Sequence, residues 1–364
     1  MKLIPLLAIQ SMLMSVFAGK TDTLRMIFIG DLMQHSAQTE EARKIAAKSE
    51  RNESLNTKGK ESYDYSGCFR YISSGFEKGD ITVANMETAF AGKPYTGYPS
   101  FSSPPSFLKA AANAGIDLFL AANNHIGDKG NSGILKTISL FDSLHVRYSG
   151  IYRDRTERDV LHPLEIDIKG FRIAILNYTY GTNGVAVKPP LIVNLIDTSE
   201  MAADLERCSR TGYDLTVVCI HWGDEYSLKS SPRQEMLAGF LTSRGADVVI
   251  GSHPHVPQNI TVNKLEPSGD ISSIVYYSLG NAISNMSAPY TRIGQMAVIR
   301  AVKDTFGRVS LLDPVTEYIW TARPGTFDDN YSIIPVSVFS AKPEAFRIRA
   351  EYDNMMYYYS RLKK

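Results

Sequence analysis

The sequence predicts an α/β fold built on a mixed β-sheet. Short runs rich in apolar and β-branched residues alternate along the chain with stretches of helical periodicity, as expected for strands and helices packed in layers. Two of these runs, 164–168 and 171–178, are separated only by Lys169-Gly170, which indicates a hairpin. A hairpin is a pair of antiparallel strands, so the sheet should be mixed rather than purely parallel.

Length and composition limit the class of protein. The chain has 364 residues, of which 44% are hydrophobic, so it can bury the core of one large domain or two small ones. Lys and Arg number 39 against 38 Asp and Glu, so no strongly basic field favours nucleic acid as a partner. The three cysteines are odd in number and do not support a disulfide framework.

Residues 1–18 predict a signal peptide. Lys2 gives a positive start, Leu3 to Phe17 is mostly apolar, and Val16-Phe17-Ala18 offers small residues for cleavage. The apolar run is short for a membrane span, which needs about 20 residues. We therefore expect export across the inner membrane to an extracytoplasmic location, with membrane anchoring as the alternative if the segment stays uncleaved.

The remaining elements follow in order. Strands are predicted at 26–29, 81–84, 116–121, 164–168, 171–178, 215–220, 247–250, 274–279, 295–301 and 308–312. Helices are predicted at 105–114, 132–144, 199–209 and 232–244. The last of these has the clearest start, because Ser231 is a good cap and Pro232 suits the first helical position.

Two further segments need separate interpretation. Residues 40–62 are highly charged and indicate a solvated helix or a mobile insertion. The tail 341–364 predicts a C-terminal helix packed on a domain that spans 24–340. Its Met355-Met356-Tyr357-Tyr358-Tyr359 segment favours core packing over a docking face for a partner.

Residues able to bind a metal follow five separate apolar runs. They are Asp31, Glu87, Asn124 with His125, His221, and His253 with His255. In an α/β sheet the carboxyl ends of neighbouring strands meet at one edge, where ligands bind. Residues more than two hundred positions apart are therefore predicted to form one polynuclear metal site.

Each of these strings alone has a structural alternative. Asp31 could cap a helix, Glu87 could be an ion-pair partner, and His221 could be a satisfied core histidine. After His221, Asp224 and Glu225 are more typical of a solvated loop than of a catalytic role.

His253-Pro254-His255 is the most specific string. Alternate residues of an extended segment point the same way, and Pro254 restricts the backbone. Two imidazoles so placed could each hold one of two adjacent metals.

Together the strings resemble the CapA family, the capsule and poly-γ-glutamate biosynthesis proteins related to calcineurin-like metallophosphatases. The matching stretches lie in family order over about residues 26 to 285. They are Gly30-Asp31-Leu32-Met33, Asn85-Met86-Glu87, Ala122-Asn123-Asn124-His125 with Asp128 and Gly130, His221 to Tyr226, Gly251 to Gln258, and Tyr277 to Asn281.

The resemblance implies a metallophosphatase-like αββα sandwich with mixed sheets. It implies that Asp31 and His255 bind one metal, that Asn124, His221 and His253 bind the other, and that Glu87 bridges them. His125 would assist the leaving group. One departure is Met33, where the phosphatases usually carry an imidazole, so either His35 completes that site or one metal binds weakly.

The resemblance implies a metal-dependent hydrolase, similar to phosphoesterases, that makes or processes an envelope polymer with one or two divalent ions (Zn, Mn or Fe). A phosphoester or a polyanionic envelope polymer such as poly-γ-glutamate would be its substrate, within a membrane biosynthesis or export complex. The alternatives are a non-catalytic component of a capsule export assembly that binds the polymer or a partner, and a purely structural one-metal site.

Overall fold

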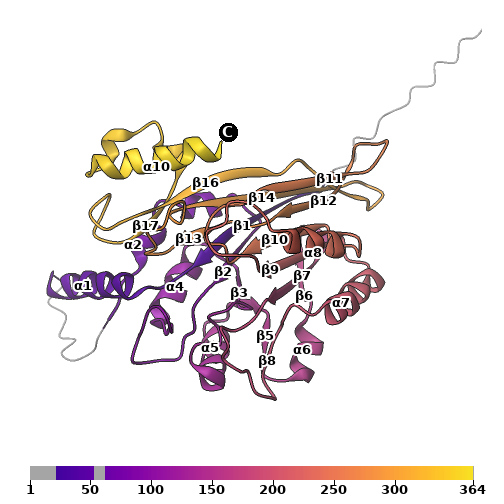
Figure 1. Ribbon diagram of the computed structural model, residues 1–364, viewed down its shortest axis with the longest axis horizontal. Helices are drawn as coiled ribbons and strands as arrows, with labels where there is room; N and C mark the ends of the chain where they lie inside the picture. Colours follow the sequence, from indigo (N-terminus) through magenta and orange to yellow (C-terminus); the bar gives the residue numbers. More distant parts are fainter. Residues whose placement is uncertain (1–21, 53–61, 364) are drawn as a thin grey trace, which may run out of the picture.

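The computed structural model describes residues 22–52 and 62–363 (Figure 1). The predicted signal peptide 1–18 lies outside the described residues, as does most of the second half of the charged segment 40–62. The first half of that segment belongs to a helix, α1, which spans Ser36–Asn52. Within the described ranges, no helix is long and apolar enough to cross a lipid bilayer.

Strands dominate the centre of the molecule. They are β1 (Asp22–Leu32), β2 (Ile81–Met86), β3 (Leu118–Leu120), β4 (Arg147–Ser149), β5 (Ile151–Tyr152), β6 (Leu164–Ile168), β7 (Phe171–Thr179), β8 (Ile192–Val193), β9 (Leu215–His221), β10 (Val248–Ser252), β11 (Ile260–Lys264), β12 (Ile271–Tyr276), β13 (Asn281–Ile283), β14 (Ile293–Lys303), β15 (Val309–Leu311), β16 (Val315–Ala322) and β17 (Ser332–Pro335). All ten predicted strands are present, as β1, β2, β3, β6, β7, β9, β10, β12, β14 and β15.

Helices surround the strands. They are α1, α2 (Ser66–Phe69), α3 (Ser73–Phe76), α4 (Pro105–Asn113), α5 (Gly130–Ser143), α6 (Arg155–Leu161), α7 (Thr198–Thr211), α8 (Pro232–Thr242), α9 (Val336–Phe339) and α10 (Arg349–Leu362), with a short 3₁₀ turn at Pro343–Ala345. The four predicted helices are confirmed as α4, α5, α7 and α8. The Ser231 side chain caps α8 as predicted, within a capping box formed with Gln234.

The sheet is mixed, as predicted. Its strand order is β4-β3-β2-β1-β14-β15-β12-β10-β9-β7-β6. Strands β1 to β4 form one parallel block, and β7, β9, β10 and β12 form a second. The predicted hairpin is confirmed, because β6 and β7 pair antiparallel through Lys169 and Gly170, which both have positive φ.

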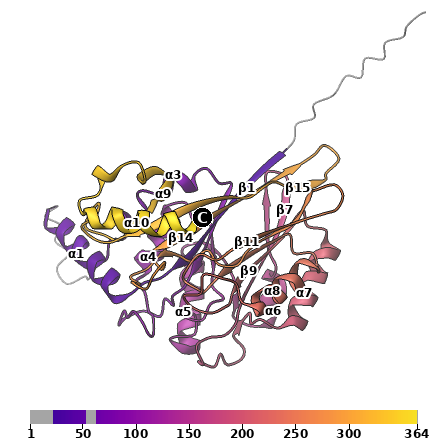
Figure 2. The same cartoon turned by 45° about the horizontal axis from the view of Figure 1, so that its top comes forward.

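The layers form an αββα sandwich, which confirms the predicted fold class. One core lies between the two parallel blocks, with side chains such as Met26 and Val83 from the first and Val217 and Val248 from the second. The outer face of the first block packs on α4 and α5, and the outer face of the second packs on α7 and α8 (Figures 1 and 2). Both blocks therefore direct their strand ends toward one shared edge.

The C-terminal helix α10 lies against β14 and β16 (Figure 1). Met355 is fully buried there, in a cluster that also contains Trp320 and Phe346. The Trp320 ring stacks on Tyr358 with a centroid distance of 6.1 Å. The helix thus contributes apolar side chains to the protein's own core.

Candidate metal centre

The carboxyl edge of the two parallel blocks gathers six polar side chains from five segments. Asp31 lies at the end of β1, Glu87 follows β2, His221 ends β9, and His253 follows β10. Asn124 lies in the loop after β3, and His255 lies two residues beyond His253. We call these six residues the His–carboxylate cluster. All six predicted metal ligands lie together, and all are buried.

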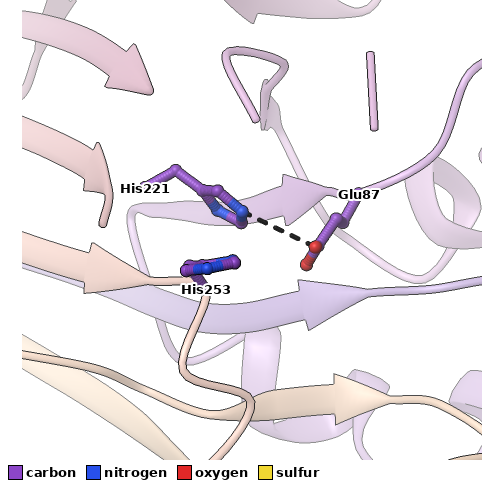
Figure 3. Close-up of side chains that lie close together, drawn as sticks. All are labelled: Glu87, His221 and His253. Atoms are coloured by element: carbon purple, nitrogen blue, oxygen red, sulfur yellow. Dashed lines mark ion pairs between the residues drawn. The ribbon is translucent and has the colours of Figure 1, made fainter. Parts of the chain in front are cut away.

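Glu87 lies at the centre of the His–carboxylate cluster. Its Oε1 is 3.5 Å from Nε2 of His221 (Figure 3). The same oxygen is 3.9 Å from Nε2 of His255. Both carboxylate oxygens are buried and accept no hydrogen bond. Burial raises the pKa of Glu87 to about 8, and the nearby charge of Asp31 adds to the rise. An ionised carboxylate here requires a cation, because a buried charge without a partner is very costly.

His221 is oriented by hydrogen bonds on both ring nitrogens. Nδ1 is 2.9 Å from Oγ of Ser252, and Nε2 is 2.9 Å from Oδ1 of Asn124. An N–H on Nε2 can donate to Oδ1 of Asn124. With the proton on Nδ1 instead, where it donates to Ser252, the lone pair of Nε2 would be available to a metal shared with Asn124 and Glu87. A metal-bound histidine characteristically donates its other N–H in this way. Burial lowers the pKa of His221 to about 3, so the ring is neutral.

His253 and His255 are not in an extended segment, so the geometric reason given for their pairing was wrong. Their φ angles are +98° and +59°, a region that residues other than glycine rarely adopt. Such conformations cluster at functional sites, where the surrounding structure holds them. The two imidazoles nevertheless lie side by side, with centroids 5.8 Å apart, and Nδ1 of His253 is buried without a hydrogen-bond partner.

Asp31 and His255 form a second part of the His–carboxylate cluster. Oδ2 of Asp31 is 3.3 Å from Nδ1 of His255, and Oδ1 accepts a hydrogen bond of 2.8 Å from Asn85. Burial alone would lower the pKa of His255, but the charges of Glu87 and Asp31 outweigh it and raise the pKa to about 9. Conversely, burial would raise the pKa of Asp31, and His255 lowers it.

The donor set fits a divalent metal. Ligand atoms of Glu87, His221 and His253 lie within 4.8 Å of one another, and so do those of Asp31, Glu87 and His255. Glu87 is common to both groups, which is the arrangement expected of a bridging carboxylate. Mixed nitrogen and oxygen donors suit Zn, Mn or Fe. The unpartnered Glu87 oxygens and His253 Nδ1 are the atoms that such an ion would satisfy.

His125 lies beside the His–carboxylate cluster rather than in it. Its Nδ1 is 2.8 Å from Oδ2 of Asp128, and its ring packs edge-on against Phe101 at 4.6 Å. His125 belongs to none of the groups of metal-binding atoms among the described residues. Asp128 therefore positions the imidazole and leaves Nε2 for another partner.

His35 does not join the His–carboxylate cluster. Its Nδ1 lies 3.2 Å from Oε1 of Gln38 and 3.3 Å from the backbone N of Asn285. Met33 is buried and offers no imidazole.

Glu225 lies nearer the cluster than the sequence analysis expected. It is exposed, as predicted for a solvated loop, but a carboxylate oxygen of Glu225 lies within 4.8 Å of ligand atoms of His253 and His255.

The sequence analysis assigned no role to the residues that orient the predicted metal ligands. Asn85 donates to Asp31, Ser252 holds His221, and Asn281 lies 3.0 Å from Nδ1 of His255. Tyr180 covers one side, with its ring centroid 4.6 Å from that of His253. The strand-end position of Asn85 and Ser252 was a usable signal, whereas nothing in the sequence around Tyr180 marked it.

The fold and the candidate metal centre together define the class of protein: an α/β sandwich with a buried cluster of imidazoles and carboxylates at the edge of its sheet. The chain belongs to the family described as bacterial capsule synthesis protein PGA_cap, whose model matches residues 25–286. The matched range contains every residue of the His–carboxylate cluster.

Two curated relatives are similar over the same part of the chain. A capsule biosynthesis protein CapA of Bacillus anthracis is 30% identical over 243 residues, which cover 64% of this chain and 56% of that protein. A PGA biosynthesis protein CapA of Bacillus subtilis (strain 168) is 25% identical over 252 residues, which cover 66% and 62%. The alignments thus span about three fifths of the length of these relatives.

Solved structures with a similar arrangement include two nucleotidases. The NAD nucleotidase of Haemophilus influenzae has a TM-score of 0.48 and 13% identity, covering 94% of this chain and 68% of that one. The 5′-nucleotidase from Candida albicans SC5314 has a TM-score of 0.38 and 10% identity, covering 77% and 51%. Likeness at this level says nothing of what this chain acts on.

Proposed function

We propose that this protein is a metal-dependent hydrolase, similar to phosphoesterases, that acts in making or processing a capsule polymer. The observation that carries the proposal is the Glu87 carboxylate, which is fully buried, has no hydrogen-bond donor and faces imidazoles. A structural carboxylate would be paired, because unsatisfied buried polar groups are rare in folded proteins. Membership of the capsule synthesis family supports the biological setting.

The residues divide into holding and proton-transfer groups. Asp31, Asn124, His221, His253 and His255 would hold one or two divalent ions, with Glu87 between them. Such ions supply Lewis-acid polarisation of a phosphoester or amide and activate water for attack. Ser252 and Asn85 keep His221 and Asp31 in place through the hydrogen bonds described above.

His125 is the residue suited to the leaving group. In its protonated form, Nδ1–H donates to Asp128, and Nε2–H is available for a departing oxygen or nitrogen. Proton transfer of this kind is worth about 10²–10⁴-fold in rate. The Phe101 ring packed against His125 limits the movement of the imidazole.

The family favours an envelope location, and the apolar segment 3–17 favours export across the inner membrane. We therefore propose an extracytoplasmic protein that meets its polymer outside the cytoplasm, with other members of a membrane biosynthesis or export complex. Fractionation of cells producing the full chain tests this, and recovery of the protein in the cytoplasm would refute it.

The alternative is a component that binds the polymer or a partner without turnover, which Met33 favours because it removes one expected imidazole.

Elemental analysis of the purified protein distinguishes the hydrolase from the binding component, followed by assays of phosphomonoesters, phosphodiesters and γ-linked glutamate oligomers with Zn²⁺, Mn²⁺ or Fe²⁺ restored. The hydrolase predicts at least one metal per chain, lost in a His253→Ala, His255→Ala double variant, and turnover that depends on it. Bound metal without turnover of any of these substrates would favour the binding component.

A further inference from the structure

A cavity of about 560 Å³ opens beside the His–carboxylate cluster. We call it the α8 cavity, because the first turn of α8 forms one wall. Its polar and aromatic lining includes Tyr180, Trp222, Asp224, Ser231, Arg233 and Gln234. The volume lies within the range of sites that hold small molecules or one unit of a polymer.

Tyr180 joins the α8 cavity to the His–carboxylate cluster. Its ring is nearly parallel to that of His221, at 9° and 6.2 Å, and lies 4.6 Å from His253. Yet 45% of the side chain is exposed. A large aromatic ring left open beside buried imidazoles offers its remaining surface to a ring of the ligand.

The other walls provide planar polar groups at fixed positions. The Gln234 amide is buried and held by Ser231 and Gln258. Trp222 is buried, with its indole N–H donating 2.8 Å to the carbonyl of Tyr277, so it forms a rigid floor. Asp224 and Arg233 are exposed at the rim. In the described part of the chain neither forms an ion pair, so both can hydrogen-bond a ligand.

The charges argue against a polymer with a carboxylate on every unit. The α8 cavity holds one acid and one cation, with no net positive charge. A neutral ring with hydroxyl groups matches this lining better than a chain of glutamates does.

We propose that the α8 cavity binds a sugar ring, so that the substrate is a phosphate-linked saccharide whose phosphoester lies at the His–carboxylate cluster. The apolar face of the sugar packs on Tyr180, and its hydroxyl groups bond to Asp224 and Arg233. This assignment of the substrate class rests on the proposed hydrolase function.

Binding of non-hydrolysable ligands tests the α8 cavity without turnover. Calorimetry on the full chain with Mn²⁺ restored would compare the phosphonate analogues of N-acetylglucosamine 1-phosphate and adenosine 5′-monophosphate with a γ-linked glutamate trimer. The sugar phosphonate should bind most tightly. Tyr180→Ala should raise its Kd by about tenfold, the scale of losing a large apolar contact with the ligand. Tyr180→Phe should bind close to wild type, because it keeps the ring.

A control variant and a second test variant complete the binding experiment. Tyr357→Ala removes a tyrosine of similar exposure, 49%, on the distant helix α10, and should not change binding. Arg233→Ala changes an exposed side chain, so it tests the α8 cavity even if Tyr180→Ala fails to fold. Both Arg233→Ala and Tyr180→Ala should weaken binding of the sugar phosphonate.

The outcomes separate the two proposals. If the glutamate trimer binds as tightly as the sugar phosphonate, or if Tyr180→Ala and Arg233→Ala both bind like wild type, the saccharide assignment is wrong. If the adenosine phosphonate binds most tightly and depends on Tyr180, the α8 cavity takes a nucleobase instead. If binding is as expected but no phosphoester is hydrolysed with any metal, the hydrolase proposal fails and the saccharide site stands.

Discussion

Metal binding to the His–carboxylate cluster should release protons. Burial raises the pKa of Glu87 to about 8. The ionised carboxylates of Glu87 and Asp31 overcome burial and raise the pKa of His255 to about 9. Because a protonated Glu87 no longer raises the pKa of His255, the two groups together hold at least one proton at pH 7. A metal needs the ionised carboxylate and a neutral imidazole. Binding at pH 7 should therefore release at least one proton.

The magnitude follows from the same values. Below both pKa values, each proton that must leave weakens binding about tenfold for every unit by which the pH falls. The apparent Kd should therefore fall at least about tenfold per pH unit between pH 6 and pH 7, and level off above pH 9. His221 adds nothing to this count, because burial lowers its pKa to about 3 and the ring is already neutral.

Calorimetric titration of Mn²⁺ in buffers of different ionisation enthalpy measures the number of protons released. Glu87→Gln should release fewer protons, since the amide does not titrate and no longer raises the pKa of His255. His35→Ala is the matched control: burial lowers the pKa of His35 to about 4, and the ring lies outside the cluster, so affinity and proton count should match wild type. Wild-type affinity that is unchanged between pH 6 and pH 8 would refute the reasoning.

Three further predictions concern the surroundings of the cluster. His125→Ala should keep its metal and lose about 10²–10⁴-fold in kcat, and Asp128→Asn should lose less, as measured by steady-state kinetics and metal analysis. Loss of metal in His125→Ala would contradict the assignment of His125 to proton transfer rather than to metal binding. Asn177→Leu removes the acceptor, at 2.8 Å, for the buried N–H of Ala122 and should lower the free energy of unfolding in urea by about 1–3 kcal/mol. Trp320→Ala should lower it by about 3–5 kcal/mol and leave metal content unchanged, because the ring is fully buried under α10.

The sequence predicted the fold class and the residues that gather at the edge of the sheet for a physical reason. Buried parallel strands such as β9 and β10 are continuous apolar runs, so the first polar residue after each run marks the edge of the sheet. Short strands such as β5 and β8, two residues each, have no periodicity and were missed. The eight-residue β16 was also missed, because its outer half is polar and partly exposed.

The remaining features of the site depend on tertiary structure. Glu225 is exposed and follows a strand end by four residues, so only the path of its loop brings it back to His253. The positive φ of His253 and His255 could not be read from a string that contains proline. Tyr180 follows β7 directly and has no charged or metal-binding group, so its contact with two imidazoles is visible only in the folded protein.

Strand β1 fixes how far the cluster lies from the start of the described chain. It runs from Asp22 to Leu32, and Asp31 lies nine positions from its first residue. An extended strand covers this interval in about 30 Å. Because β1 pairs with β14 from Asp22 onward, the sheet holds this distance constant. A label or tether joined ahead of Asp22 would therefore lie at the opposite end of the sheet from the cluster and leave the cluster open to ligands.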